Sequence, residues 1–178
     1  MAAMRRDGAG YWLIDGLNIV RLQGKDAPRF DILLALTYHL LQENVDFLCV
    51  FDASARPCLR EFQGSFVAEL CRELIHRFPG RFSEVPAGTV ADDAILDISS
   101  FFGPKVITND QYRDHTDRHP WLETSREEML SGVQLRQDSR RRELLLWKDI
   151  AIPVPPFQGI RSFANRHTQL LAQGESKP

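Results

Sequence analysis

Short apolar runs alternate with longer amphipathic stretches along most of the chain, and this alternation constrains the fold more than any other feature. The apolar runs predict strands over residues 11–14, 45–51, 81–85 and 105–108. Apolar residues at helical spacing predict helices over 31–42, 62–78 and 91–102. Strands that alternate with helices pair in parallel through right-handed crossovers. The sequence therefore predicts an α/β fold with a central, mostly parallel sheet.

The pattern weakens beyond residue 120. A short helix is expected over 124–130, and strands over 132–135 and 143–147 form a hairpin around the polar turn 137–142. The prolines of residues 153–156 are expected to end regular structure. With 178 residues, we expect a single domain. The expected divisions are a flexible N-terminus (1–10), one domain (11–172, with a core over 11–120 and a C-terminal appendage over 121–172) and a tail (173–178).

The composition excludes several classes of protein. We find no run of about 18 apolar residues and no apolar segment near the N-terminus, so neither a membrane span nor a signal peptide is expected. Three cysteines without C-x-x-C spacing indicate reduced thiols rather than a disulfide framework or a zinc site. These features favour a cytoplasmic protein with no membrane partner.

Acidic residues lie where the expected strands end. Asp15 ends the first strand, Asp92 and Asp93 follow the third, and Asp110 follows the fourth, with Asp114 one turn later. Ligands of parallel sheets bind beyond the carboxyl ends of the strands. Carboxylates gathered there repel one another unless a hard cation such as Mg²⁺ or Mn²⁺ neutralises them. The spacing therefore predicts a metal site.

Each of these residues also has a purely structural interpretation. The alternatives are a turn at Asp15 or Asp110, a cap at Asn18, an N-cap at Asp92 or Asp93, and a surface ion pair between Arg113 and Asp114. For Asp52, which ends the second strand, the structural role is favoured. One cap needs one carboxylate, so the second acid of the Asp92–Asp93 pair is unexplained. The functional interpretation rests on several separate segments that place acids at the same end of the sheet.

Three motifs carry a resemblance to a known family. They have the forms D-G-x-N (15–18), D-D-x-I-L (92–96) and N-D-x-Y-R-D (109–114). In this order they resemble the NYN branch of the PIN-like ribonuclease superfamily, most closely the Regnase type, from about residue 11 to 120. The resemblance implies a Rossmann-like three-layer sandwich. The sequence departs from Regnase in lacking its cysteine-histidine zinc finger.

The resemblance also implies an activity, namely Mg²⁺- or Mn²⁺-dependent endoribonuclease cleavage that leaves a 5′-phosphate and a 3′-hydroxyl. PIN-like domains often form homo-oligomers, so self-association is a further expectation. The implied catalytic residues are Asp15, Asn18, Asp92, Asp93, Asp110 and Asp114. We expect Asp15, Asp93 and Asp110 to bind the metal directly or through water. Asp92 and Asp114 would hold metal-bound waters or orient Asn18 and Arg113.

Basic residues near these acids are the candidates for binding RNA. They are Arg21, Lys25, Arg113, Arg140, Arg141 and Arg142, with Arg56 and Arg60 as weaker candidates. For the three arginines of the hairpin turn, phosphate binding and a solvated tip are equally compatible with the sequence. The formal net charge is −2, but without the five candidate aspartates 22 basic residues face 19 acidic ones. An acidic pocket in a mildly basic body permits RNA binding at this net charge.

Other enzyme classes fit the sequence less well. A haloacid-dehalogenase-type phosphatase needs a D-x-D pair, whereas Leu17 stands at its third position. A receiver domain needs paired acids after the first strand and a lysine after a later strand, but Asp15 is unpaired and Lys105 precedes its strand. The sequence has neither a P-loop nor a dinucleotide-binding glycine motif. The remaining alternative is a non-catalytic RNA-binding or protein-interaction module on the same fold.

Overall fold

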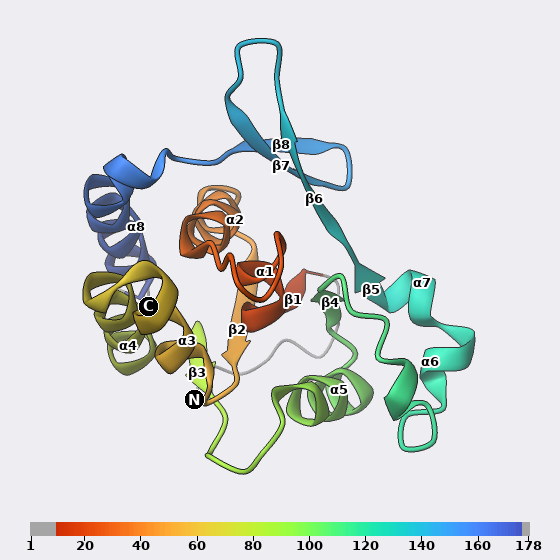
Figure 1. Cartoon of the computed structure of the whole chain (residues 1–178). Coiled ribbons are helices and arrows are strands. Elements are labelled where there is room, and N and C mark those ends of the chain that lie inside the picture. Colours follow the sequence, from red (N-terminus) through yellow and green to blue (C-terminus); the bar gives the residue numbers. More distant parts are fainter. Residues whose placement is uncertain (1–9, 176–178) are drawn as a thin grey trace.

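A parallel sheet forms the centre of the computed structural model, which describes residues 10–175 (Figure 1). Within this range, the five strands of the sheet lie in the order β3-β2-β1-β4-β5, and each adjacent pair is parallel. The strands are β1 (Tyr11–Asp15), β2 (Asp46–Phe51), β3 (Phe82–Glu84), β4 (Lys105–Ile107) and β5 (Leu130–Ser131). The predicted parallel α/β sheet is therefore confirmed.

Helices cover both faces of the sheet. They are α1 (Gly16–Val20), α2 (Phe30–Gln42), α3 (Ala55–Gln63), α4 (Ser65–Arg77), α5 (Ala91–Phe102), α6 (Trp121–Thr124), α7 (Arg126–Met129) and α8 (Ile160–Glu175). Alternate residues of β1 pack into different cores: Trp12 and Ile14 face α2 and α8, whereas Leu13 faces α5. This alternation produces three layers, with the sheet in the middle.

The helix predicted over residues 62–78 corresponds to α4, and only its first two residues belong to the end of α3. Gly64 separates α3 from α4 and has a φ of +86°, a left-handed conformation that favours glycine. Sequence analysis missed α3, in which Pro57 occupies the first turn, where a missing N–H is tolerated. The short helix predicted over 124–130 corresponds to α7, whereas α6 was not predicted and residue 130 begins β5.

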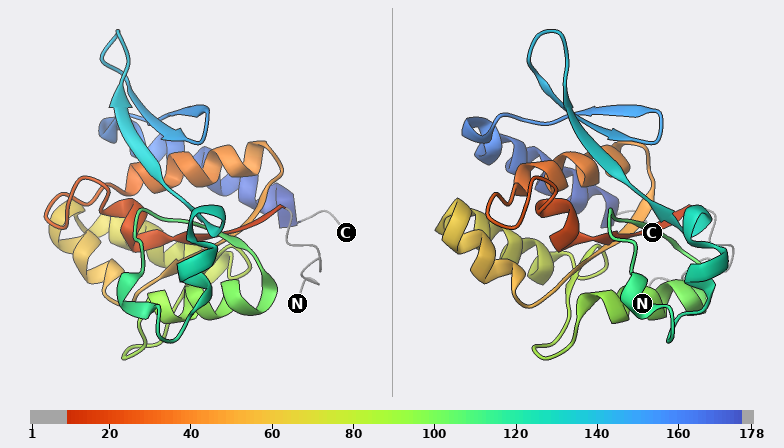
Figure 2. Two further views of the ribbon diagram at one scale, coloured as in Figure 1. Left: turned by 90° about the vertical axis from the view of Figure 1, so that its right-hand side faces the viewer. Right: turned by 45° about the vertical axis from the view of Figure 1, so that its right-hand side comes forward.

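A second sheet follows the first along the chain. The predicted hairpin consists of β6 (Val133–Gln137) and β7 (Glu143–Trp147), and β8 (Ile150–Pro153) adds a third antiparallel strand that sequence analysis missed. The turn of the hairpin projects away from the body of the molecule (Figure 2). The base of this sheet joins the main core through Leu145 and Ile152, and Trp147 packs edge to face on Trp12.

The expectation that regular structure ends at residues 153–156 is wrong, because α8 follows a 3₁₀ turn (Phe157–Gly159) and packs on α2. The buried face of α8 includes Phe163 and Leu171, but between them it carries His167, whose polar side chain hides the helical pattern in the sequence. His167 Nε2 lies 2.9 Å from Thr37 Oγ1, so the polar group is paired inside the core.

The ends of the chain were also assigned in the sequence analysis. Helix α8 runs to Glu175, so residues 173–175 of the predicted tail are helical. Residues 1–9 of the predicted N-terminus and residues 176–178 lie outside the described residues. Among residues 10–175, no helix is long and apolar enough to cross a membrane.

Candidate functional site

Asp15 is held at the carboxyl end of β1 by three donors. Its Oδ1 accepts a hydrogen bond from the backbone N–H of Asn18 (3.1 Å), so Asp15, and not Asn18, caps α1. Its Oδ2 accepts hydrogen bonds from Thr108 Oγ1 (3.2 Å) and from the Tyr112 hydroxyl (3.0 Å). The residue is 5% exposed. The carboxylate therefore has a fixed position between β1 and the loop after β4.

Gly16 explains why this motif needs glycine after the aspartate. A Cβ at this position would lie 2.7 Å from the Phe51 ring and 2.9 Å from Cys49 Sγ, both on β2. These distances are shorter than side-chain atoms tolerate. Glycine therefore lets α1 start against β2 immediately after Asp15.

The environment of Asp15 disfavours its charge. Burial raises the pKa of Asp15 to about 6, the Asp92 carboxylate adds to this increase, and the hydrogen bonds from Asn18, Tyr112 and Thr108 oppose it. The raised pKa means that the hydrogen bonds to the ionised carboxylate do not fully offset the unfavourable effect of its burial. A cation at this position would stabilise the ionised form.

Asp92 and Asp93 lie in the first turn of α5. The N-cap of this helix is Val90, whose side chain forms no capping hydrogen bond. The alternative that one of the two aspartates is the N-cap is therefore wrong. Burial raises the pKa of Asp92, and the carboxylates of Asp110, Asp93 and Asp52 raise it further, whereas His115 lowers it. Acids from separate segments thus share one electrostatic environment, as the strand-end pattern predicted.

The loop after β4 carries Asp110 and ties the edge of the sheet together. Asp110 Oδ1 accepts from the backbone N–H of Tyr112 (2.8 Å), so the turn interpretation is observed for this residue. Asn18 Oδ1 accepts from the backbone N–H of Asn109 (2.8 Å), which orients Asn18 in place of Asp92 or Asp114. The Asn109 amide in turn pairs with both backbone groups of Val133, at 2.7 and 2.9 Å. The motif therefore links α1, β4 and the start of β6.

Two basic side chains that sequence analysis did not assign to the site contact Asp93. His115 Nδ1 lies 3.1 Å from Asp93 Oδ1, and His115 Nε2 lies 3.7 Å from Asp92 Oδ2. Arg118 Nη2 lies 3.0 Å from Asp93 Oδ1. The available sequence signal was the position of His115, immediately after the N-D-x-Y-R-D motif. Within residues 10–175, no group of three histidine, cysteine, aspartate or glutamate side chains is arranged to hold a metal ion.

Other residues singled out in the sequence lie outside this cluster or serve the fold. Asp114 and Arg113 are exposed on a 3₁₀ turn (Arg113–His115), and Lys25 is exposed between α1 and α2. Arg21 ends α1, and its charge helps to lower the pKa of Asp52. The larger cause of that lowered pKa is the hydrogen bond from the Ser54 N–H (2.8 Å), which confirms the structural role expected for Asp52.

The arginines of the hairpin turn are partly committed to the turn itself. Asp138 Oδ1 accepts from the backbone N–H groups of Arg140 and Arg142, and the Arg142 guanidinium pairs with Asp138 Oδ2 at 2.7 Å. Arg141 has a φ of +59°, as a tight turn requires. Asp138 therefore shapes this turn and neutralises part of its charge.

A solved structure shares this fold. The nuclear proteinaceous RNase P 2 (PRORP2) from A. thaliana matches with a TM-score of 0.59 and 19% identity over 83% of this chain. The match covers 31% of that protein's chain. No family model matches the chain, and no curated protein sequence is significantly similar to it. The likeness shows that the chain shares the α/β fold of the matched part of that structure.

Proposed function

We propose that this chain is a metal-dependent endoribonuclease that hydrolyses phosphodiester bonds of RNA at the carboxyl edge of the sheet. The observation that carries the proposal is that Asp110, half-buried Asp92 and buried Asp15 come from three segments and influence one another's charge, which together with burial raises the pKa of Asp15 and Asp92. Asp15, Asp92 and Asp110 have no lysine or arginine ion pair within the described part of the chain. The shared fold with an RNase P supports the same activity class.

The donor chemistry suits Mg²⁺ or Mn²⁺, since both ions prefer carboxylate oxygens. Asp15, Asp93 and Asp110 would hold the ion once it draws their carboxylates together, since they form no preformed ligand group among residues 10–175. When bound, such a metal activates water and stabilises charge on a phosphate. Thr108 and Tyr112 keep Asp15 in one position, and Asn109 does the same for Asn18. Arg118 and His115 occupy Asp93 in this structure, so a metal at Asp93 would take over their neutralising role.

The finer features of the proposal come from the resemblance to PIN-like nucleases. They are cleavage within the chain of an RNA, products with a 5′-phosphate and a 3′-hydroxyl, and self-association. The relation to the Regnase type remains a prediction from the three motifs.

The test is cleavage of labelled RNA and matched DNA with Mg²⁺, Mn²⁺ or a chelator. We expect RNA cleavage that requires metal. Asp110→Asn should lower the rate by more than about 100-fold, the upper range for groups that merely support a metal ligand. The matched control is Asp117→Asn, which removes an exposed carboxylate from the same loop and should retain activity.

Four outcomes would contradict the proposal in whole or in part. Cleavage without metal would exclude the mechanism, and so would full activity of Asp110→Asn. Tight RNA binding with no cleavage, whichever metal is added, would support a non-catalytic RNA-binding module on the same fold. Preferential cleavage of DNA would retain the chemistry but change the substrate class.

A further inference from the structure

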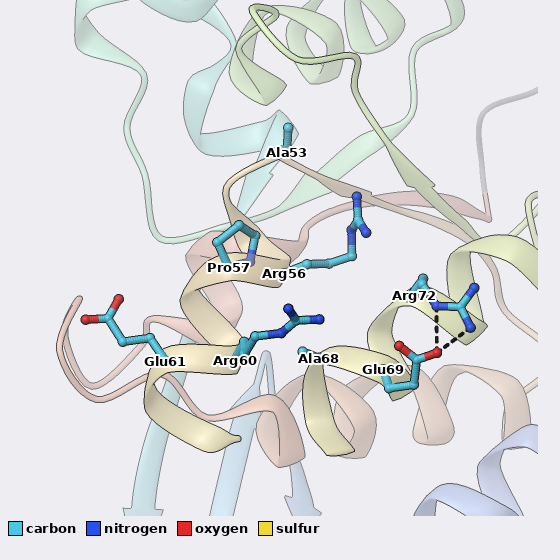
Figure 3. Close-up of a pocket in the computed structure, with 8 residues that line it drawn as sticks. All are labelled: Ala53, Arg56, Pro57, Arg60, Glu61, Ala68, Glu69 and Arg72. Atoms are coloured by element: carbon cyan, nitrogen blue, oxygen red, sulfur yellow. Dashed lines mark hydrogen bonds and ion pairs between the residues drawn. The ribbon is translucent and has the colours of Figure 1, made fainter. Parts of the chain in front are cut away.

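A groove between α3 and α4 has the composition of a phosphate-binding site. Its volume is about 430 Å³. Three kinds of side chain line it: the arginines Arg56, Arg60 and Arg72, the glutamates Glu61 and Glu69, and the small apolar residues Ala53, Pro57 and Ala68 (Figure 3). Cavities of this size hold small ligands, and apolar walls with a few charged groups are typical of them.

The positive charge of the groove is only partly neutralised. Arg56 forms two hydrogen bonds with Glu84, at 2.6 and 2.9 Å, and Arg72 pairs with Glu69. Arg60 is exposed and has neither a hydrogen bond nor an ion pair within residues 10–175. Its guanidinium extends from α3 towards α4, and the Glu61 carboxylate points away from that guanidinium (Figure 3). Arg60 is therefore free to bind an anion.

The groove begins beside the candidate active site. Ala53 lines the groove and directly follows Asp52, whose carboxylate raises the pKa of Asp92. A second cavity of about 380 Å³ shares Arg56 and Arg72 with the first and continues to His76 and Pro79. Together the two cavities form a path lined by three arginines and three glutamates, in which, among the described residues, Arg56 and Arg72 are ion-paired and Arg60 is not.

We propose that this α3–α4 groove binds the unpaired RNA strand next to the cleaved bond. The proposal rests on the proposed function and adds the substrate class and the path of the strand. Arg60 binds a backbone phosphate, with Arg56 and Arg72 beside it, and a sugar or base packs on the small apolar residues. A guanidinium suits this role because its planar fork matches phosphate oxygens. The groove lies between two helices, so a single strand fits it better than a duplex.

Binding is best measured separately from cleavage. The full chain carrying Asp110→Asn, with Mg²⁺ present, is titrated into a fluorescent single-stranded oligouridylate and into an RNA duplex at several salt concentrations. Adding Arg60→Gln should weaken single-strand binding by about tenfold, the lower end for a charge-assisted hydrogen bond. It should also reduce the slope of log affinity against log salt by about 0.7, which corresponds to one phosphate contact on a single strand.

The matched control is Arg77→Gln, which removes the same charge from α4 outside the groove and should leave affinity and salt slope unchanged. Arg60→Glu should weaken binding further than Arg60→Gln. Unfolding midpoints in urea establish that all variants are folded.

The groove proposal and the nuclease proposal can be contradicted independently of each other. Unchanged affinity in Arg60→Gln, or tighter binding of the duplex than of the single strand, overturns the groove proposal even if the wild-type protein cleaves RNA. A selective loss of binding in Arg60→Gln, without cleavage by the wild-type protein under any metal, supports the groove and overturns the nuclease.

Discussion

Asp31 and Glu143 share one arginine, whereas Asp15, Asp92 and Asp110 share none among the described residues. In the first group, Arg29 lies 2.6 Å from both carboxylates and joins α2 to the start of β7. In the second group, three segments bring acids to one edge of the sheet. There the negative charge of one carboxylate makes ionisation of its neighbours less favourable. The same side-chain type thus occurs in two opposite electrostatic settings.

The direction of the pKa shifts records this difference. The hydrogen bond from Arg29 lowers the pKa of Glu143, and hydrogen bonds to Asp31 and then Glu143 raise the pKa of Arg29. Burial raises the pKa of Asp15, and no basic side chain is among the causes that oppose it. The Arg29 group is complete within the fold and serves stability. The acidic edge is incomplete, and a cation from solution is the group that would complete it.

The largest effect on stability is expected from removing Arg29, which pairs with Asp31 and Glu143. Arg29→Met leaves the fully buried Asp31 without its partner, which should lower the free energy of unfolding by about 3–5 kcal/mol. Urea unfolding measures this loss. Arg77→Met, which removes an exposed ion pair, is the control and should have little effect. An equal loss in both variants would mean that the buried group has no special role.

The acidic edge should instead destabilise the protein when it is ionised. We therefore expect the free energy of unfolding to fall as the pH rises. With a pKa of about 6, native Asp15 keeps a proton between about pH 4 and 6 that the unfolded chain has lost. Without metal, its contribution to stability is therefore complete below about pH 4 and is lost as the pH rises through 6. The loss is about 3 kcal/mol, from 1.36 kcal/mol per unit of pKa.

Urea unfolding of the wild-type protein and Asp15→Asn from pH 4 to 7.5 measures this contribution. The wild-type protein should lose stability relative to the variant over this range, and Asp117→Asn should follow the wild type. Parallel curves for the wild-type protein and Asp15→Asn would show that Asp15 is already ionised at pH 4 and adequately compensated.

Metal removal tests whether the acidic edge repels RNA when no cation neutralises its carboxylates. Close like charges in water cost about 1 kcal/mol per pair. A chelator should therefore weaken RNA binding by Asp110→Asn by roughly tenfold, which equals 1.4 kcal/mol. Anisotropy titrations with and without Mg²⁺ measure this change. Equal affinity in both conditions would indicate that RNA does not approach the acids.

The smallest effect is expected at the hairpin turn. Replacing Arg140, Arg141 and Arg142 with glutamine should weaken single-strand binding by less than about threefold, since Asp138 already pairs with part of this charge at an exposed site. The same titration measures it beside Arg60→Gln. A larger loss from the hairpin than from the groove would reverse the relative importance of these two basic regions.

Local patterns made the sheet and its acids predictable from the sequence. The apolar runs that became β1, β2 and β4 are buried on both faces. Asp15 ends β1 and Asp110 closely follows β4, whereas Asp92 and Asp93 follow β3 only after a longer loop. The hairpin was predictable for the same reason, because its strands and polar turn are contiguous.

Contacts between distant segments were not predictable. His115 and Arg118 reach Asp93 only because the loop after β4 folds back over the start of α5. The division between α3 and α4 depends on the left-handed conformation of Gly64, which a glycine in the sequence permits but does not require. Helix α8 was missed because the partner of His167 is Thr37, on α2.

The position of α8 has a consequence for synthesis of the protein on the ribosome. Thr37 and His167 are 130 residues apart, and the apolar face of α8 covers α2. At about 5–20 residues per second, roughly 7 to 26 seconds pass between translation of these two residues. During this interval the outer face of α2 lacks its native cover, so the nascent chain is a natural client for chaperones that shield apolar surface.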